Sequence, residues 1–550
     1  MCGVTALLHA GATPEERRGL RQTVLAMSRR QRHRGPDGGH VRAFPHCTLG
    51  HERLCIVGGM GGAQPIQEHG CALVANGEIY NHEALRKRCA ASYVCATASD
   101  CEVIAGVLSQ PGQVLDQMNM LDGQFAFVWT DVGTGRVIVG RDPLGICSLY
   151  MARGGSYTYV VSEMKALEGV DDLEDVTLFP PGHVWDSLTG DMRAYYMPMW
   201  MMPVALPTQT HADAHMRACL TQAVRKRLMS DPGVQVGVLL SGGLDSSLIT
   251  SMAMRLMRDI HGPRAVLHSF SIGMAGSPDL AAARLVATFL GTTHHEVVYT
   301  PQDGLDALED VIYHVETYDM TTVRASTPNY LLGRAIRAAG VKVVLSGEAA
   351  DELFAGYTYF KACPTRQEMF TETCRKVTQL HMYDFARAHK SLLASGVEVR
   401  VPFADQAVVH MAMTMDPKHK LSTTHPEGPR IEKDVLRNAF DTPDDPYLPK
   451  TILFRAKDQF SDAVSGHVNW ITTCQDEAAH HTFPPVTQNP PFTLEHALYR
   501  HLFDAQFVRW NAMYVQTVPH QKSCACSTEE ALRWSKTLVS QADPSGRVTV

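Results

Sequence analysis

The sequence lacks the features that mark secreted, membrane-spanning and nucleic-acid-binding proteins. No apolar run reaches the ~18–20 residues that a membrane span requires, and residues 1–8 contain no basic stretch followed by a long apolar core, as a secretory signal would. No long run of lysine or arginine is present, and the formal net charge is 50 − 57 = −7 with histidines neutral. These absences predict a protein that binds neither membrane nor nucleic acid.

The cysteine spacing also excludes two classes of protein. The fourteen cysteines are scattered singly from Cys2 to Cys526, and their spacing fits neither a secreted disulfide framework nor a paired CxxC zinc site. We therefore expect a reducing compartment and a cytoplasmic location.

What is present separates into two halves, although 550 residues alone suggest about three to four domains. Residues 2–196 contain short β-rich runs broken by glycine turns, such as Cys71–Ala75 and Gln124–Trp129. This texture predicts an antiparallel, sheet-dominated domain with a few helices, around 84–89 and 102–108. Residues 197–215 form a connector without a clear period.

Residues 216–521 have a strand–loop–helix texture. The apolar run Val234–Leu240 precedes the helical segment Leu248–Arg258, and similar runs occur at Val266–Ile272 and Val341–Leu345. Short apolar runs of this kind fit strands buried on both faces, which predicts an α/β domain with a parallel sheet and ligands at the carboxyl ends of its strands. The polar tail, 522–550, is expected to be poorly ordered.

Cys2 directly follows the initiator methionine. Removal of Met1 would give Cys2 a free α-amino group with a reference pKa of about 7.7–8, which could accept the proton of its own thiol. Taken alone, a cysteine at this position is more often an ordinary N-terminal residue.

Four further motifs follow in order: His33–Asp37, His51–Leu54, Asn76–Asn81 and Ser99–Glu102. With Cys2-Gly3 they resemble the glutaminase domain of the class II glutamine amidotransferases, which has an N-terminal-nucleophile (Ntn) fold. The resemblance implies that Cys2 attacks the amide while Asn76 and the Gly77 N–H form the oxyanion hole. It implies that Arg53 holds the glutamine carboxylate, that Glu78 and Asp100 hold its ammonium group, and that the full glutamine pocket comprises Arg53, Leu54, Cys55, Ile56, Val57, Asn76, Gly77, Glu78 and Asp100.

The segment Val238–Ser247 carries the sequence SGGLDSS between a strand and a helix. Glycines let a backbone approach phosphates, and a helix N-terminus adds N–H donors. The motif resembles the pyrophosphate loop of the N-type ATP pyrophosphatases, which cleave ATP between the α and β phosphates. The resemblance implies that Asp245 holds Mg²⁺ and that ATP contacts Leu240, Ser241, Gly242, Gly243, Asp245, Ser246 and Ile272.

The segment Leu345–Tyr357 resembles the second signature of the asparagine synthetases. By this resemblance Ser346 and Gly347 border the nucleotide, Asp351 is the second Mg²⁺ ligand, and Glu348 assists the aspartyl-adenylate. Ala349, Ala350 and Ala355 depart from the family, which usually has glycine–serine and glycine there. Because alanine disfavours positive φ, we expect right-handed or extended backbone at these positions.

Three cations complete the predicted synthetase site. Arg324 and Arg400 are expected to bind aspartate, and Lys457 in a KxQFSD stretch is expected to bind the nucleotide. Any one of them, taken alone, is more often an ordinary surface charge.

From Cys2 to about Trp470 the chain resembles the glutamine-hydrolysing asparagine synthetases. The resemblance implies ATP-dependent synthesis of asparagine from aspartate with glutamine or ammonia, through a β-aspartyl-AMP intermediate, with release of AMP, pyrophosphate and glutamate; it also implies a homodimer. Relatives of this layout that amidate other carboxylates or close β-lactam rings are an alternative, but the β-lactam formers typically lack the N-terminal cysteine. A non-catalytic scaffold is opposed by the intact Cys2, Arg53, Asp100, Asp245 and Asp351.

Overall fold

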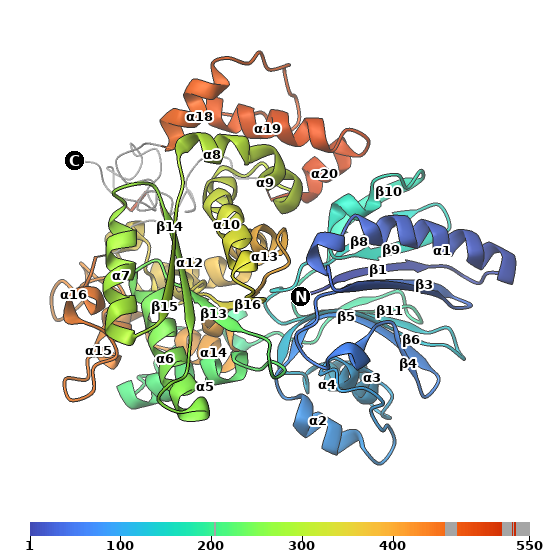
Figure 1. Ribbon diagram of the computed structural model, residues 1–550, viewed down its shortest axis with the longest axis horizontal. Coiled ribbons are helices and arrows are strands. Elements are labelled where there is room, and N and C mark those ends of the chain that lie inside the picture. Colours follow the sequence, from blue (N-terminus) through green and yellow to red (C-terminus); the bar gives the residue numbers. More distant parts are fainter. Residues whose placement is uncertain (203–204, 457–469, 520–530, 532, 535–550) are drawn as a thin grey trace.

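The computed structural model describes residues 1–202, 205–456, 470–519, 531, 533 and 534. The chain forms two lobes, a sheet-rich N-terminal lobe and a larger C-terminal lobe built around a parallel sheet (Figure 1). Within the described residues, no helix is both long and apolar enough to cross a membrane.

The N-terminal lobe contains two six-stranded antiparallel sheets. The first has the order β10-β8-β9-β1-β3-β2 and the second the order β12-β11-β7-β6-β5-β4. The strands are β1 (Gly3–Leu8), β2 (Gly38–Ala43), β3 (Cys47–Arg53), β4 (Ile66–Glu68), β5 (Cys71–Ile79), β6 (Gly123–Asp131), β7 (Val137–Arg141), β8 (Tyr150–Gly154), β9 (Tyr157–Val161), β10 (Leu173–Leu178), β11 (His183–Asp186) and β12 (Met192–Ala194).

The two sheets pack face to face through alternating apolar side chains. Val4 and Leu49 of the first sheet share a buried cluster with Val74 and Val128 of the second. Helix α1 (Pro14–Arg29) covers the outer face of the first sheet, while α2 (His82–Cys89), α3 (Glu102–Leu108) and α4 (Val114–Met118) lie against the second (Figure 1). The lobe is therefore a four-layer α-β-β-α sandwich.

The C-terminal lobe has a five-stranded parallel sheet of order β15-β14-β13-β16-β17. Its strands are β13 (Val236–Leu239), β14 (His268–Gly273), β15 (Thr293–Val298), β16 (Val343–Leu345) and β17 (Glu398–Arg400). Its helices are α5 (Asp213–Arg227), α6 (Leu244–His261), α7 (Pro278–Leu290), α8 (Pro301–Asp306), α9 (Leu308–Val315), α10 (Met320–Ala338), α11 (Ala350–Phe354), α12 (Arg366–Gln379), α13 (Asp384–Leu393), α14 (Gln406–Thr414), α15 (Asp434–Ala439), α16 (Lys450–Leu453), α18 (Trp470–Ala478), α19 (Leu494–Gln506) and α20 (Asn511–Thr517).

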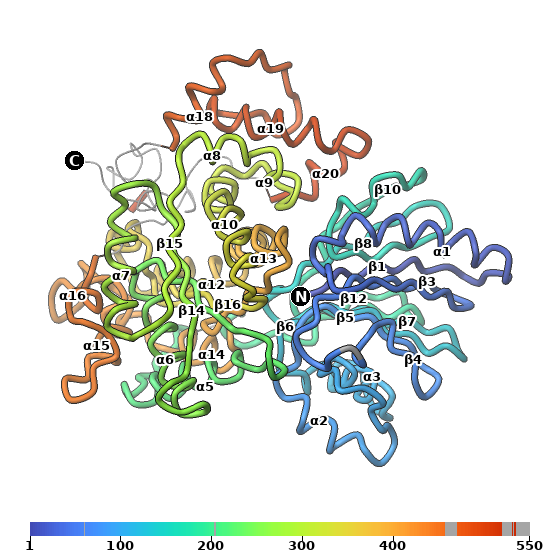
Figure 2. Tube along the Cα trace, viewed as in Figure 1, coloured from blue at the N-terminus to red at the C-terminus, as the bar shows by residue number. Residues whose placement is uncertain are grey.

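Chain segments distant in sequence join the lobes. Helices α18–α20 lie over α8 and α9, and α20 reaches β10 of the N-terminal lobe, where Thr517 Oγ1 donates to Val176 O (Figure 2). The Tyr514 hydroxyl of α20 also donates to Met164 O of the same lobe at 2.8 Å. The edge strand β17 faces the N-terminal lobe, and Gln124 Nε2 donates to Val399 O across the boundary at 3.2 Å.

The predicted fold class is confirmed: antiparallel sheets form the N-terminal half and a parallel sheet the C-terminal half. In the connector, Trp200 is buried and its carbonyl accepts from Cys374 Sγ of α12 at 3.3 Å, so this segment packs on the C-terminal lobe. Three residues of the predicted tail are described, and the expected poor order of the tail remains a prediction. Ala531 is fully buried, and the Trp534 ring lies 6.0 Å from that of Tyr359.

Candidate active sites

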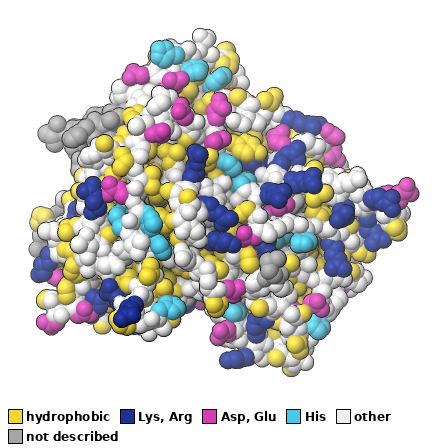
Figure 3. All heavy atoms as spheres, in the orientation of Figure 1, with side chains coloured by type: hydrophobic (Ala, Val, Ile, Leu, Met, Phe, Trp, Pro, Cys, Tyr) yellow, Lys and Arg dark blue, Asp and Glu magenta, His cyan; other side chains and the backbone are white. Residues whose placement is uncertain are grey.

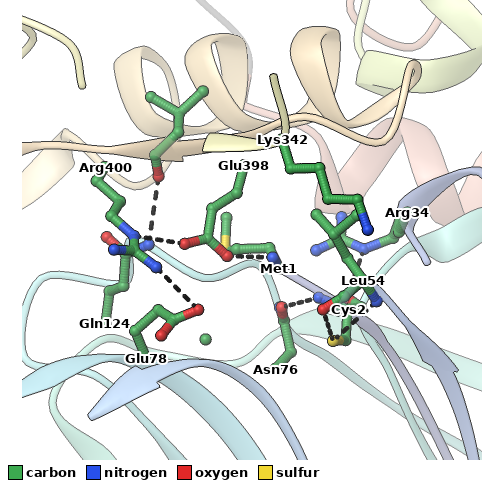
Figure 4. Close-up of polar contacts among 12 residues, drawn as sticks. Met1, Cys2, Arg34, Leu54, Asn76, Glu78, Gln124, Lys342, Glu398 and Arg400 are labelled. Carbon is green, nitrogen blue, oxygen red and sulfur yellow. Dashed lines mark hydrogen bonds and ion pairs between the residues drawn. The ribbon is translucent and has the colours of Figure 1, made fainter. Parts of the chain in front are cut away.

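Cys2 lies at the boundary between the lobes, next to the end of β3 (Figure 4). Pairing of β1 with β3 sets Gly3 opposite Glu52, and this register brings the cysteine beside Leu54. Leu54 N donates to Cys2 Sγ at 3.4 Å, and Cys2 N donates to Asn76 Oδ1 at 2.6 Å. The predicted nucleophile and oxyanion-hole residue are thus in direct contact.

The Asn76 amide has one side bound and one side open. Its oxygen must accept the Cys2 N–H, which fixes the orientation of the amide. Its Nδ2 is buried without a hydrogen-bond partner among the described residues. Buried amide donors are rarely left unpaired, so this nitrogen is suited to a ligand oxygen that binds beside the cysteine.

Gly77 follows Asn76 in a backbone conformation that needs glycine. Its φ is +129°, and a Cβ there would lie 1.9 Å from Gln124 O. Close pairing of β5 with β6 therefore requires a residue without a side chain here.

Met1 occupies a buried position between Cys2 and the C-terminal lobe (Figure 4). Its amino group forms an ion pair with Glu398 of β17. Burial lowers the pKa of this amine, but Glu398, Cys2 and Glu78 together outweigh that effect and raise it above the ordinary value. Burial raises the pKa of the Cys2 thiol, so in this form the thiol is protonated near neutral pH and needs a base.

Three further predicted glutamine-binding residues, Arg53, Glu78 and Asp100, are buried in the same lobe. Arg53 is buried at the end of β3 and donates to Gly59 O. Asp100 Oδ2 accepts from Ile79 N at 2.7 Å, and burial raises the pKa of its carboxyl. Glu78 Oε2 is buried with no hydrogen-bond partner in the described part of the chain, and burial raises the pKa of this carboxyl well above its ordinary value. An ammonium group could satisfy such an oxygen.

Arg400 lies on β17, at the boundary with the N-terminal lobe. Side chains two apart on a strand share a face, so Glu398 and Arg400 of β17 both point toward the N-terminal lobe. Arg400 Nη2 is 3.1 Å from Glu78 Oε1, and its Nε is 2.7 Å from Glu398 Oε1 (Figure 4). This placement makes Arg400 part of the boundary beside the predicted glutamine site, and aspartate binding by Arg400 remains a prediction.

The predicted phosphate loop joins β13 to α6. Gly243 is the residue before the helix, and Ser241 Oγ and Ser246 Oγ are 3.0 Å apart across the loop. Gly242 has φ +77°, and a Cβ there would lie 2.5 Å from Ala283 N of α7. Leu240 N donates to Phe270 O at 2.8 Å, which sets Leu240 beside β14, the strand that carries Ile272.

The second signature lies against this loop at the carboxyl ends of the strands. A Cβ on Gly347 would lie 2.8 Å from Ser246 N, so the two loops touch at a glycine. Ser346 Oγ accepts from Glu348 N at 3.3 Å, and Glu348 Oε2 pairs with Arg387 Nη2 at 2.6 Å. Burial raises the pKa of Glu348 above its ordinary value, and Arg387 opposes this rise.

Lys433 joins the two predicted magnesium ligands and was missed by the sequence analysis. Its Nζ is 2.5 Å from Asp245 Oδ2 and 2.5 Å from Asp351 Oδ1. Lys433 is more than 80 residues from either carboxylate in sequence, and no local motif marks it, so only the fold could have revealed it.

The donor set fits Mg²⁺ bound together with a nucleotide. Asp245 Oδ1 is buried without a partner among the described residues, and both carboxylates already converge on one cation. No group of three or more protein ligands suited to a metal occurs in the part of the chain that the structure describes. Mg²⁺ commonly binds one or two carboxylates plus substrate phosphates, so a two-carboxylate site is sufficient.

Two predicted cations are not brought to these loops. Arg324 is buried and forms a bidentate ion pair with Glu495 of α19. Its Nε donates to Oε1 at 2.6 Å and its Nη2 to Oε2 at 2.5 Å. It joins α10 to α19 in this structure, and aspartate binding by Arg324 remains a prediction. Lys457 lies outside the described residues.

The expectation of right-handed or extended backbone around Glu348 is wrong. Ala349 has φ +76° and Ala355 has φ +54°, both left-handed, whereas Ala350 lies within α11. Left-handed backbone costs an alanine roughly 1–2 kcal/mol. Both alanines are buried, and Leu353 N donates to Ala349 O while Gly356 N donates to Asp351 O. Packing and these bonds around α11 therefore outweigh the local preference.

Comparison with known proteins agrees with this arrangement. The family described as asparagine synthase matches residues 215–373 and 362–512, and the glutamine amidotransferase domain family matches residues 1–178. The chain is 46% identical over 565 aligned residues to asparagine synthetase [glutamine-hydrolyzing] 3 of Arabidopsis thaliana, covering 100% of this chain and 95% of that protein. It is 45% identical to asparagine synthetase [glutamine-hydrolyzing] 2 of Oryza sativa subsp. japonica, covering 100% of this chain and 93% of that protein.

Among solved structures, the glutamine phosphoribosylpyrophosphate amidotransferase of B. subtilis matches with a TM-score of 0.31 at 16% identity, covering 54% of this chain and 81% of that chain. A likeness this low adds no argument. The full-length relatives are sufficient by themselves: the chain belongs to the family of the glutamine-hydrolysing asparagine synthetases.

Proposed function

We propose that the protein is a ligase that makes asparagine from aspartate, using ATP for activation and glutamine, or ammonia, as the nitrogen donor. The observation that carries the proposal is the presence of two complementary sites in one chain. A buried cysteine lies beside an unpartnered amide donor in one lobe, and two glycine loops with converging carboxylates lie at the carboxyl ends of the strands in the other.

The glutaminase reaction requires prior hydrolytic removal of Met1, which makes Cys2 the N-terminal residue. Its amine, where Cys2 N now contacts Asn76, takes the proton of the thiol, and the thiolate attacks the glutamine side-chain amide. Asn76 Nδ2 and the Gly77 N–H stabilise the oxyanion, and the amine gives its proton to the leaving nitrogen, which departs as ammonia. Water then hydrolyses the γ-glutamyl thioester and releases glutamate.

Charge complementarity supports the proposed orientation of glutamine. Arg53 binds its carboxylate through a planar guanidinium, while Glu78 and Asp100 bind its ammonium group. Leu54, Cys55, Ile56 and Val57 form the wall between glutamine and the C-terminal lobe, where Ile56 O accepts from Asp231 N at 3.0 Å.

In the synthetase reaction, the aspartate side-chain carboxylate attacks the α-phosphorus of ATP and pyrophosphate leaves. The loop residues Ser241, Gly242, Gly243 and Ser246 bind the phosphates, and Ser346 and Gly347 border the nucleotide. Asp245 and Asp351 would hold Mg²⁺, which supplies charge neutralisation at the phosphate oxygens when bound. Ammonia attacks the β-aspartyl-AMP, assisted by Glu348, to give asparagine and AMP.

Further proposals concern organisation. We propose a glutaminase domain at 2–196, a connector at 197–215 and an ATP-pyrophosphatase domain at 216–521. We also propose a homodimer, by family resemblance, and a cytoplasmic location. The location is supported by the twelve cysteines in the described residues, all of which are free of disulfides. On the face shown in Figure 3, charges of both signs appear on both lobes, in keeping with small-molecule rather than nucleic-acid partners.

The proposal is tested by pyrophosphate release from ATP with aspartate and either glutamine or ammonium. We expect both nitrogen donors to support release with one asparagine formed per pyrophosphate. A chain that releases pyrophosphate with another carboxylate, and not with aspartate, would belong to the alternative class that amidates other carboxylates.

A further inference from the structure

The loop that bounds the glutamine pocket, residues 54–62, is held by the C-terminal lobe. We call it the glutamine loop. Gly59 N donates to Asp231 Oδ2 at 2.7 Å, and Asp231 N donates to Ile56 O at 3.0 Å. A single aspartate of the other lobe thus binds the glutamine loop through both its side chain and its backbone.

Gly59 connects this contact to Arg53, the residue predicted to bind the glutamine carboxylate. Its carbonyl accepts from Arg53 Nη2, while its N–H is bound to Asp231. The loop also folds closely over the arginine, since a Cβ on Gly62 would lie 2.7 Å from Arg53 Nη2. A change in the position of Asp231 would therefore move the carbonyl that orients Arg53.

A second contact fixes the start of the same loop. Lys342 Nζ lies 2.8 Å from Asp37 Oδ2 and 3.4 Å from Cys55 O, and Asp37 Oδ2 also accepts from Cys55 N at 2.8 Å. Partial burial would raise the pKa of Asp37, but the bonds from Lys342 and Cys55 N hold it below its ordinary value. The Asp37 carboxyl therefore stays ionised at neutral pH.

Both contacts lie at the beginnings of strands whose far ends carry the nucleotide loops. Asp231 is five residues before β13, which runs into Ser241–Ser246, and Lys342 directly precedes β16, which runs into Ser346–Glu348. The two strands are hydrogen-bonded neighbours in the parallel sheet. Short buried strands move as rigid units, so a shift at the nucleotide loops would reach the glutamine loop through them.

The segment next to Asp231 is also fixed by β17. Arg400 Nη1 donates to Arg227 O at 2.9 Å and also to Met229 O, while its Nη2 reaches Glu78. Three of the five strands therefore meet the glutamine pocket at the same boundary.

We propose that Asp231 and Lys342 are positioning residues for glutamine, and that they couple glutamine binding to occupation of the nucleotide site. This inference rests on the proposed glutaminase function. It assigns a role in the glutamine reaction to two residues of the synthetase lobe that touch neither the cysteine nor the predicted phosphate loop.

Steady-state kinetics of the full-length enzyme tests the positioning role. Asp231→Ala removes a charged acceptor, and we expect the KM for glutamine to rise about tenfold with little change in kcat. Lys342→Met removes a partly exposed pair and should raise that KM about threefold. Ammonia-dependent synthesis by the same preparations should stay unchanged, which also shows that the variants fold.

Asp259→Ala and Lys87→Met, two exposed positions outside both sites, are the matched controls. A glutamine KM of Asp231→Ala equal to that of Asp259→Ala would overturn the positioning role. Equal loss of the glutamine-dependent and ammonia-dependent reactions would also overturn it, because it would indicate general damage.

Calorimetry tests the coupling in the Cys2→Ala background, where glutamine binds without turnover. We expect the Kd for glutamine to change at least about threefold when α,β-methylene-ATP, Mg²⁺ and aspartate are added, and this ratio to approach one when Asp231→Ala is added. A ratio of one in the parent would refute the coupling. If the unmodified enzyme makes no asparagine with glutamine, the proposed function itself fails; if it does and Asp231→Ala matches its control, only this inference fails.

Discussion

At the scale of single residues, the most informative groups are buried polar atoms that lack a partner. Asn76 Nδ2 and Glu78 Oε2 belong to the predicted glutamine site, and Asp245 Oδ1 belongs to the predicted nucleotide site. An unpaired buried donor or acceptor costs roughly 1–3 kcal/mol. That cost is explained if each atom gains a partner when ligands bind. The partners would be the oxyanion, the ammonium group of glutamine and the magnesium ion, respectively.

The open amide of Asn76 leads to a direct prediction. Asn76→Ala should lower kcat of the glutamine reaction about 10²–10³-fold, because one oxyanion donor is lost. Synthesis from ammonium chloride by the same preparation should be unaffected. Parallel loss of both activities would contradict the assignment of Asn76 to the oxyanion hole.

The left-handed alanines give a prediction about stability. Ala355→Gly should stabilise the chain by up to about 1 kcal/mol, because glycine adopts φ +54° without the steric cost. The stabilisation is measured as an increase in the urea concentration at the midpoint of unfolding of the C-terminal lobe. Ala350→Gly, at a helical position, is the control and should be destabilising by about 0.5–1 kcal/mol.

At the scale of elements, the sequence predicted strands and loops better than it predicted which partner a side chain meets. Val236–Leu239 and Val343–Leu345 are buried on both faces, and their apolar runs are visible in the sequence. The loops after them follow from glycine chemistry. Both nucleotide loops therefore lie at one edge of the sheet, as expected for parallel strands.

Contacts created by tertiary packing could not be predicted in the same way. Lys433 reaches Asp245 and Asp351 from a distant segment, and Arg400 faces Glu78 only because β17 is the edge strand next to the other lobe. Local preference also failed at Ala349, where surrounding contacts fix a backbone that alanine disfavours. Residue type and spacing carry no information on such docking.

The pair that joins α10 to α19 gives a prediction at this scale. Glu495→Ala removes the carboxylate whose two oxygens accept from the Arg324 guanidinium. Removing one partner of a buried ion pair costs about 3–5 kcal/mol. We expect amide hydrogen exchange in α18 and α19 to accelerate by about 100-fold or more, with little change in β1–β9. Glu309→Ala, an exposed position on α9, should leave the exchange pattern unchanged.

At the scale of the whole molecule, a buried network of charges fastens the two lobes together. Glu163 of the N-terminal lobe binds Arg34 at 2.8 Å and Lys165 at 2.8 Å, and Lys165 lies 3.2 Å from Glu316 of the other lobe. Glu316 in turn binds Lys390 at 2.7 Å. Arg34 also donates to Cys2 O at 2.9 Å, so the network reaches the nucleophile.

This network predicts a pH dependence. Burial would raise the pKa of Glu163, but Lys165, His33 and Arg34 together lower it well below the ordinary value. The unfolded carboxyl titrates near pH ~4.3. A depressed folded pKa contributes stability above that pH, and the contribution is lost as pH falls through the folded pKa. We expect the free energy of unfolding, measured by tryptophan fluorescence, to fall steeply as the pH is lowered below about 4.3.

Glu163→Gln should reduce the slope of the unfolding free energy against pH in this acidic range, because the carboxyl that takes up the proton is absent. Glu15→Gln, at an exposed position on α1, should retain the slope of the unmodified protein. An unchanged slope in Glu163→Gln would show that other carboxyls govern the acid transition.

The proposal that the N-terminal lobe hydrolyses glutamine and the C-terminal lobe makes asparagine is tested most directly by Cys2→Ala. The Cys2 thiol contacts Leu54 and lies beside Asn76, on the opposite side of the lobe boundary from Asp245 and Asp351. The measurement is asparagine formation from aspartate and ATP by the full-length variant, with glutamine and with ammonium chloride in parallel. We predict that glutamine no longer supports synthesis while ammonium supports it at the unmodified rate; loss of both activities, or retention of glutamine-dependent synthesis, would contradict the account.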